Sequence, residues 1–343
     1  MKSVHDNTLS PRLRRPSTCL HPWLPALLIA TVALSACGGG GADDPAPLST
    51  AMQANTLVAS ASVADEDTSA LSPSAARARA KRKTATTTTA PTPAPAPTPT
   101  PSGRWAPQLG DTWQWQLSGT IDTSVDAKVY DIDLFDTPAA TISALKAAGR
   151  RVVCYFSAGS SENWRSDFSR FAAADMGNSL DGWAGERWLD TRSANVREIM
   201  KSRLDLAVSR GCDGVEPDNV DGYTNGPGFP LTAATQVDYN RFLATEAHSR
   251  GLAIALKNAV DLLSQLEPDF DFAINEQCNQ YSECGGYSVF TSKGKPVFNA
   301  EYKSLWKTDA TARASLCAAS KAANIRTLVL PLSLNGSLRY SCD

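Results

Sequence analysis

Histidine is scarce in this chain of 343 residues, which contains only His5, His21 and His248. A histidine-rich zinc site, a Ser-His-Asp triad and a Cys-His dyad all need histidines, and after removal of an N-terminal signal only His248 would remain. His248 lies in FLATEAHSRGL, near the C-terminal end of an expected helix, where interaction with the helix dipole is its expected role. We therefore expect any proton chemistry to depend on carboxylates.

The chain also lacks the features of several ligand-binding classes. Its net charge is only -2, and no basic stripe interleaved with aromatic residues occurs, so a nucleic-acid partner is not expected. The one basic cluster, residues 77–83, lies in a low-complexity segment. No GxGxxG motif follows the first expected strand, and no CxxC spacing is present. We expect neither a cofactor nor a metal.

Residues 1–37 have the pattern of an export signal. Basic residues precede an apolar run over residues 24–33 that is too short to span a membrane permanently. The run ends in LSAC, which resembles the bacterial lipobox, so we expect lipidation of Cys37; a plain secretory signal is the alternative. Gly38 stands where an aspartate would resemble an inner-membrane retention signal. The expected location is the outer membrane or the cell surface, or outside the cell if the signal is only secretory.

Residues 38–104 are rich in Ala, Thr, Ser and Pro and close on TTTTAPTPAPAPTPTP. Such a segment buries too little apolar surface to offset its conformational entropy, and its prolines favour an extended spacer. We expect a disordered linker. Residues 105–343 then have the length typical of one barrel domain, roughly 250 residues.

Short apolar strand patterns alternate with helical patterns in residues 105–343, as in parallel α/β folds. The strand candidates are residues 112–117, 129–134, 151–157, 187–189, 214–218, 252–257, 270–275, 296–301 and 327–332. Helices are expected at residues 139–148, 193–210, 236–250 and 308–323. A (β/α)8 TIM barrel accounts for this alternation best, although one strand candidate is surplus.

Six cysteines remain after the signal. Cys278 and Cys284 flank a short loop that a disulfide would close, and Cys317 and Cys342 would join the tail to the last helix. The other two, Cys154 and Cys212, are expected in and just before strands, where buried free thiols are at least as plausible as a bridge.

Residues 211–223, GCDGVEPDNVDGY, place four carboxylates in one strand and the loop after it. Alternation of side chains along a strand puts Glu216 and Asp218 on the same face. Carboxylates crowded together raise one another's pKa, which a fold tolerates mainly where a cation or a proton-transfer task uses them. A solvated acidic turn is the alternative, and Asp221 fits a helix N-cap equally well.

The segment VYDIDLFD directs Asp131 and Asp133 toward the barrel interior, because Tyr130, Ile132 and Leu134 match a helix-covered exterior. We favour ligand binding, since carboxylates near the C-terminal end of a barrel strand face the active site. A DxD metal motif and an ion pair with a lysine such as Lys257 remain alternatives.

Other expected strands also deliver polar or aromatic residues to the same end of the barrel. Carboxylates, amides, lysine and aromatics together suit a sugar polymer, because carboxylates do the chemistry and aromatic rings stack on sugars. Trp113 and Trp115 fit the core better than such a platform. The expected substrate-binding residues are Asp131, Asp133, Tyr155, Glu162, Glu216, Asn219, Asp221, Lys257, Asn258 and Glu301.

Several motifs together resemble glycoside hydrolase family 114, the endo-α-1,4-polygalactosaminidases. They are WQWQL, VYDIDLFDT, VVCYFSAGS, GERWLD, VREIM, GCDGVEPDNVDGY, GLAIALKN, FDFAINEQC and FNAEY. The resemblance implies a (β/α)8 barrel that hydrolyses α-1,4-linked galactosamine-containing polysaccharide. It also implies a catalytic pair formed by Asp218 and Glu276. Surplus carboxylates would attract such a polymer, which is cationic once deacetylated.

Glycoside hydrolysis requires two carboxylates, and we expect a retaining enzyme with Asp218 as nucleophile and Glu276 as acid/base. Strand alternation gives Glu276 the parity of Phe272 and Ile274, which we expect on the exterior. The chain would then need a turn or bulge at Asn275. A non-catalytic sugar-binding lipoprotein and a metal-dependent transferase or deacetylase using Asp131 and Asp133 are the competing hypotheses.

Overall fold

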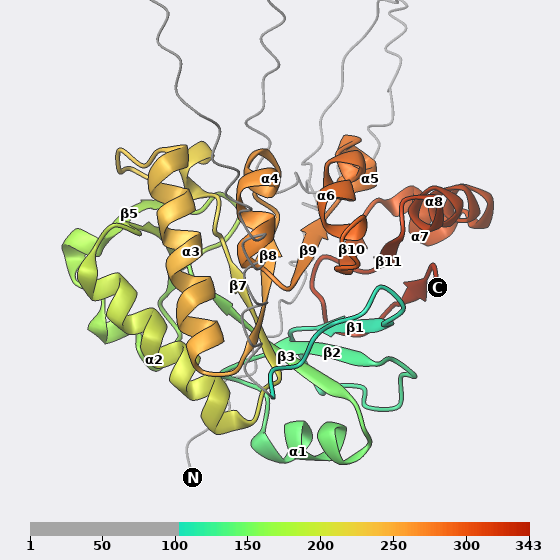
Figure 1. Cartoon of the computed structure of the whole chain (residues 1–343), viewed down its shortest axis with the longest axis horizontal. Helices are drawn as coiled ribbons and strands as arrows, with labels where there is room; N and C mark the ends of the chain where they lie inside the picture. The colour runs from blue at the N-terminus through green and yellow to red at the C-terminus, as the bar shows by residue number, and fades with distance from the viewer. Residues whose placement is uncertain (1–102) are drawn as a thin grey trace, which may run out of the picture. The chain divides into compact units, whose positions relative to one another are not determined.

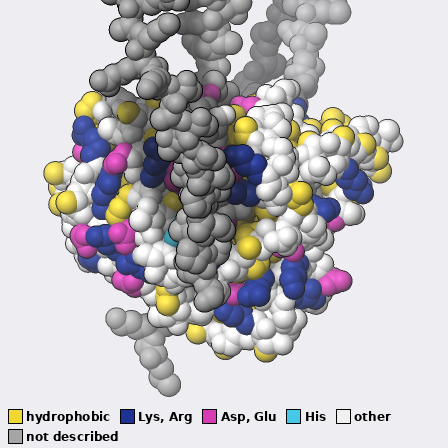
Figure 2. Space-filling model, viewed as in Figure 1, with side chains coloured by type: hydrophobic (Ala, Val, Ile, Leu, Met, Phe, Trp, Pro, Cys, Tyr) yellow, Lys and Arg dark blue, Asp and Glu magenta, His cyan; other side chains and the backbone are white. Residues whose placement is uncertain are grey.

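The computed structural model of the protein describes residues 103–343. The expected export signal, the lipidation site Cys37 and all but the last two residues of the expected linker lie outside the described residues. In the part that is described, no helix combines the length and the apolar character needed to cross a membrane. Figure 2 shows basic and acidic side chains interspersed on one face of this part.

A curled nine-stranded sheet forms the centre of the fold (Figure 1). The strands run in spatial order β1-β2-β3-β7-β8-β9-β10-β11-β12, and every neighbouring pair is parallel except β11 and β12. Their bounds are β1 Trp113–Gln116, β2 Val129–Asp133, β3 Arg151–Ser157, β7 Gly214–Asp218, β8 Ala253–Lys257, β9 Phe272–Glu276, β10 Val297–Glu301, β11 Ile325–Val329 and β12 Tyr340–Ser341. The Trp113 indole donates a hydrogen bond of 3.0 Å to the Arg326 carbonyl and so joins β1 to β11. The predicted TIM-barrel class is confirmed.

One predicted barrel strand, residues 187–189, belongs to a different sheet. β6 (Glu186–Leu189) lies between β4 (Ser160–Glu162) and β5 (Met176–Ser179) in a three-stranded antiparallel sheet. A parallel barrel strand needs a crossover connection, usually a helix, but residues 158–185 contain only short strands and 3-10 turns. The small sheet is therefore an insertion after β3.

The four predicted helices are present, with ends within three residues of those expected. They are α1 Ala139–Ala147, α2 Ala194–Arg210, α3 Ala233–Ser249 and α8 Ala310–Ala322. Side chains of Ser193, Thr232 and Asp309 accept hydrogen bonds from the first turns of α2, α3 and α8. Short helices not anticipated from the sequence connect the later strands: α4 Leu263–Leu266, α5 Cys278–Tyr281, α6 Ser288–Thr291 and α7 Ser304–Thr308.

The barrel interior is packed with aromatic side chains. Trp113 stacks on Trp115 and on Phe298, with ring centroids 5.7 and 5.1 Å apart. Phe272 and Ile274 belong to this same buried cluster, so the expectation that they face outward is wrong. Large apolar side chains pack equally well inside the barrel and under its helices, so their apolar character does not show which side they face. Strand β9 pairs with β10 in unbroken register through Glu276, so no bulge at Asn275 is needed.

Three disulfides cross-link the described domain. The predicted pairs Cys278–Cys284 and Cys317–Cys342 are confirmed. Cys154 and Cys212 also form a disulfide, with Cα atoms 6.0 Å apart, so of the two alternatives left open by the sequence the bridge is the one found. The side chain of Cys154 points out of β3 toward the segment between α2 and β7, a contact that strand parity alone does not reveal. Disulfides are typical of exported proteins.

Candidate active site

A single buried lysine joins three carboxylates at the C-terminal ends of adjacent strands. Lys257 Nζ, at the end of β8, lies 3.0 Å from Glu216 Oε1 and 3.0 Å from Asp218 Oδ1, both on β7. The same nitrogen lies 3.3 Å from Glu276 Oε2, at the end of β9. Parallel strands in register bring these ends together, as the sequence predicted for this edge of the barrel.

Two tyrosines hold the exposed members of this cluster. The Tyr155 hydroxyl donates a hydrogen bond of 2.9 Å to Asp218 Oδ2, and the Tyr302 hydroxyl donates one of 2.5 Å to Glu276 Oε1. Tyr302 was not among the predicted site residues. Strand alternation could have identified it, because Phe298, Ala300 and Tyr302 share the face of β10 that points into the barrel.

Trp115 forms the floor of the site. The centroid of its ring lies 4.9 Å from Lys257 Nζ. Trp115 belongs to the aromatic cluster that fills the barrel, so its assignment to the core is confirmed. The cation–π contact partly offsets the loss of water around an ammonium that is only 2% exposed.

Carboxylates outnumber cations in this site, and the pKa values of Glu216, Asp131 and Lys257 are all raised. Burial raises the pKa of Glu216 to about 7, although the nearby ammonium opposes the shift. Burial and the adjacent Glu216 raise the pKa of Asp131 well above its usual range. Burial alone would lower the pKa of Lys257, but Asp218, Glu216 and Glu276 outweigh it and raise the pKa well above its ordinary value. Burial thus favours the neutral form of Asp131 beside Glu216, while the surrounding carboxylates favour the charged form of Lys257.

Asp221 lies in the loop after β7, at the start of a 3-10 turn. Burial and the charge of Asp218 raise the pKa of Asp221 to about 6. The loop thus adds one more carboxylate to the acidic field around Lys257, as expected from the sequence.

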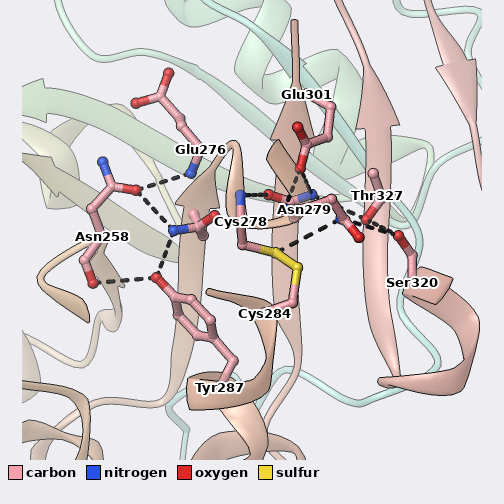
Figure 3. Close-up of a disulfide and its surroundings, with 11 residues drawn as sticks. Asn258, Glu276, Cys278, Asn279, Cys284, Tyr287, Glu301, Ser320 and Thr327 are labelled. Carbon is pink, nitrogen blue, oxygen red and sulfur yellow. Dashed lines mark hydrogen bonds between the residues drawn. A yellow bond between two sulfur atoms is a disulfide. The ribbon is translucent and has the colours of Figure 1, made fainter. Parts of the chain in front are cut away.

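The two asparagines predicted to bind substrate form hydrogen bonds with neighbouring segments of the chain. Asn219 donates from Nδ2 to the Ser157 and Ser160 hydroxyls, at 3.0 and 3.1 Å. Asn258 accepts through Oδ1 the backbone N–H of Glu276, at 2.9 Å (Figure 3). Both have positive φ, 60° and 46°, which asparagine tolerates better than most residues. Their contacts are thus with the segments that carry Asp218 and Glu276.

Asp133 and Glu162 lie in a neighbouring ion-pair network rather than around Lys257. Arg165 Nη2 lies 2.6 Å from Asp133 Oδ2 and 2.8 Å from Glu162 Oε1, and all three side chains are buried. Asp133 therefore forms a buried ion pair, but its partner is Arg165 and not a lysine.

Glu301 lies beside Asn279 of the short helix after β9 (Figure 3). Its Oε1 accepts the backbone N–H of Asn279 at 2.8 Å and the Asn299 amide at 3.1 Å. The neighbours Ala300 and Tyr302 face inward, so Glu301 has the opposite parity. The structure does not bring Glu301 together with the Lys257 cluster.

Asp131 and Asp133 do not converge on a common centre. Asp131 lies close enough to Glu216 for that carboxylate to raise its pKa, whereas Asp133 is bound by Arg165. Within residues 103–343, no group of three or more His, Cys, Asp or Glu side chains is arranged to hold a metal ion.

Known proteins resemble this chain in sequence and in structure. Residues 94–343 match glycoside-hydrolase family GH114. The crystal structure of Aspergillus fumigatus Ega3 in complex with galactosamine shares 46% identity, covers 70% of this chain and 98% of that chain, and superposes with a TM-score of 0.67. The glycoside hydrolase domain of PelA from Pseudomonas aeruginosa shares the fold at 14% identity and a TM-score of 0.54, covering 67% of this chain and 98% of its own.

An uncharacterized protein of Deinococcus radiodurans is 27% identical over 221 residues, which covers 55% of this chain and 71% of that protein. The family match extends through every barrel strand, including those that carry Lys257 and its carboxylates. The chain belongs to glycoside-hydrolase family GH114 and is a glycoside hydrolase.

Proposed function

We propose that the protein is an endo-acting, retaining hydrolase of α-1,4-linked galactosamine-containing polysaccharide, with Asp218 as nucleophile and Glu276 as acid/base. The observation that carries this proposal is the bridge of Lys257 between Asp218 and Glu276, at 3.0 and 3.3 Å. Glycoside hydrolysis needs two carboxylates on either side of one glycosidic bond. These two stand at the open ends of β7 and β9, where a polymer can reach them.

The retaining mechanism is supported by this shared contact. Because both oxygens touch one nitrogen, they can be no farther apart than the two contact distances laid end to end. This close approach of one oxygen from each carboxyl group is compatible with the ~5 Å carboxyl separation of retaining enzymes.

In the first step, a carboxylate oxygen of Asp218 forms a bond to the anomeric carbon while the glycosidic C–O bond breaks. Glu276 gives its proton to the departing oxygen, and a covalent glycosyl-enzyme results. In the second step, Glu276 takes a proton from water, whose oxygen displaces Asp218. Tyr155 and Tyr302 orient the two carboxylates through their hydrogen bonds.

The charge of the site favours a cationic substrate. Lys257 is surrounded by Glu216, Asp218 and Glu276, so the site is negative overall. A de-N-acetylated galactosamine polymer carries ammonium groups, which such a field attracts. The structure of the 46% identical Ega3 contains galactosamine, which supports the same sugar class for this chain.

Export and attachment to a membrane complete the proposal. The disulfides fit an exported protein. Cys37 in its LSAC sequence would carry the lipid, and the Pro-rich linker would extend the hydrolase from the outer membrane toward polysaccharide.

A reducing-end assay tests this function. The exported chain is incubated with partly de-N-acetylated galactosaminogalactan, with chitosan and polygalacturonate as controls and EDTA present throughout. Short oligomers should appear from the first substrate alone. Asp218→Asn and Glu276→Gln should each lower turnover by roughly 10²–10⁴-fold without loss of the fold, whereas Asp238→Asn, on the outer helix α3, should not. Binding without any cleavage would instead identify a sugar-binding lipoprotein.

A further inference from the structure

Glu186 is a buried carboxylate that the reaction described above does not use. It begins β6 in the small antiparallel sheet, and its side chain is only 8% exposed. Its Oε2 accepts a hydrogen bond of 2.6 Å from the Ser160 hydroxyl. Within residues 103–343, no partner donates to its second oxygen, Oε1, and no cation pairs with it. Buried carboxylates without a cation are costly, so this one calls for an explanation.

The side chain points toward the catalytic end of the barrel. Alternation in the antiparallel pair places Ser160, Glu186 and Trp188 on one face of the small sheet. Ser160 contacts Ser157 at the end of β3, at 2.6 Å. Trp188 packs closely against Gly222 in the loop after β7. The face that carries Glu186 therefore lies over the ends of β3 and β7.

A chain of hydrogen bonds links Glu186 to the segment that holds Asp218. The Ser160 hydroxyl contacts Ser157, and Asn219 donates to both hydroxyls at 3.0 and 3.1 Å. Ser157 is the register partner of Asp218, and Asn219 follows Asp218 directly. Glu186 is thus held at a defined position beside the catalytic carboxylate.

The nearby cation cannot neutralise Glu186, because it already has other partners. Arg165 is bound by Asp133, Glu162 and Asp136. Burial, with the charges of Glu162 and Asp218, raises the pKa of Glu186 to about 7 despite the bond from Ser160. A positive group on the substrate would stabilise the charged form of this buried carboxylate.

We propose that Glu186 binds the protonated 2-amino group of a galactosamine unit lying beside Asp218, and so selects de-N-acetylated substrate. An acetamido group has no charge to offer the carboxylate and is bulkier than an ammonium. Since this assignment names the determinant of sugar choice, it rests on the proposed function. Lys257 and its partners supply the chemistry, and Glu186 supplies the selectivity.

The variant Glu186→Gln tests the assignment, because the amide oxygen still accepts from Ser160 while the charge is lost. Steady-state kinetics are measured on galactosamine oligomers that are fully de-N-acetylated or fully N-acetylated. We expect KM for the de-N-acetylated oligomer to rise at least ~10-fold, the loss typical of a charge-assisted hydrogen bond, with kcat changed less than ~3-fold. Catalytic efficiency on the N-acetylated oligomer should not fall.

Glu198→Gln is the matched control, since the exposed Glu198 lies on the outer helix α2 and forms an ion pair with Lys201. It should leave all constants unchanged. Equal losses on both oligomers, or a loss confined to kcat, would overturn the assignment and make Glu186 a support for Asp218. Unchanged kinetics in Glu186→Gln would overturn it as well.

Failure of the proposed function is distinguishable from failure of this assignment. If the wild type cleaves neither oligomer, the proposed function is wrong. Calorimetric binding of the de-N-acetylated oligomer then still tests Glu186: at least ~10-fold weaker binding to Glu186→Gln supports the assignment, and equal binding overturns it.

Discussion

Tyr302 donates a hydrogen bond of 2.5 Å to Glu276 from the end of the adjacent strand β10. Burial and the charge of Glu276 raise the pKa of Tyr302 well above its ordinary value, so the tyrosine remains a donor at any working pH. The acid/base is therefore oriented from two sides, by the hydroxyl and by Lys257.

Removal of this donor should reduce turnover and leave the fold intact. In Tyr302→Phe the ring keeps its place in the aromatic core, while Glu276 loses one charge-assisted hydrogen bond. Such a bond contributes about 1.5–3 kcal/mol, so we expect kcat to fall roughly 10–100-fold. Steady-state kinetics measure the effect, with Tyr340→Phe at the exposed strand β12 as the control. An unchanged kcat would show that Lys257 alone orients Glu276.

Loss of the buried ammonium should destabilise the domain in a pH-dependent way. Lys257→Met leaves Glu216, Asp218 and Glu276 without their shared cation, a change that costs about 3–5 kcal/mol in unfolding free energy. Burial raises the pKa of Glu216 to about 7, so protonation of Glu216 relieves part of this cost, and the deficit should be larger at alkaline than at acidic pH. Denaturant unfolding at several pH values measures it. A deficit that does not vary with pH would point to lost packing on Trp115 instead.

Glu186 should lower stability at neutral and alkaline pH. Its pKa is raised by burial to about 7, so between about 4.5 and 7 the folded state binds more protons than the unfolded state. Stability therefore falls as pH rises through this window, and the loss is complete above pH 7. The facing groups are Glu162, Asp218, Arg165 and Tyr155.

Glu186→Gln should remove this loss. We expect the variant to be more stable than wild type by up to ~3 kcal/mol at pH 8, and equal to it near pH 4. Urea unfolding of both proteins at the two pH values gives the comparison. A variant that is less stable at pH 8 would mean that the carboxylate is satisfied in the folded protein, contrary to its lack of a cation.

Much of the fold and of the acidic site followed from the sequence because both depend on local patterns. Apolar runs alternating with helical stretches predicted the barrel, and Glu216 and Asp218 shared a face because side chains alternate along any strand. Lys257 was expected at the same edge for the same reason. The parallel pairing of β7 with β8 and of β8 with β9 places these groups next to one another.

The errors arose where the face of a strand depends on what packs against it. Apolar residues cover both sides of a barrel strand, so Phe272 gave no sign that it faces inward. The same ambiguity put Glu301 in the site. Arg165, which binds Asp133, and Cys212, which pairs with Cys154, lie far along the chain from their partners, and single-sequence patterns do not report such contacts.

Two of the disulfides should differ in what they stabilise. Cys154–Cys212 closes a loop of 58 residues and Cys278–Cys284 one of 6, so loop-closure entropy assigns about 4 kcal/mol to the first and about 2 kcal/mol to the second. Cys278, however, lies two residues after Glu276, in a segment that starts at Gln277 with φ 68° (Figure 3). The shorter loop therefore bears on catalysis more directly than on stability.

Paired Cys→Ala variants should separate these roles. Removal of Cys154–Cys212 should lower the free energy of unfolding more. Removal of Cys278–Cys284 should lower kcat more, because the segment that directly follows Glu276 loses a covalent restraint. Thermal or urea unfolding and steady-state kinetics are measured on both variants. If the longer loop's variant shows the larger loss of kcat at a temperature where both remain folded, then β3 and β7, and not the segment after β9, limit the geometry of the catalytic pair.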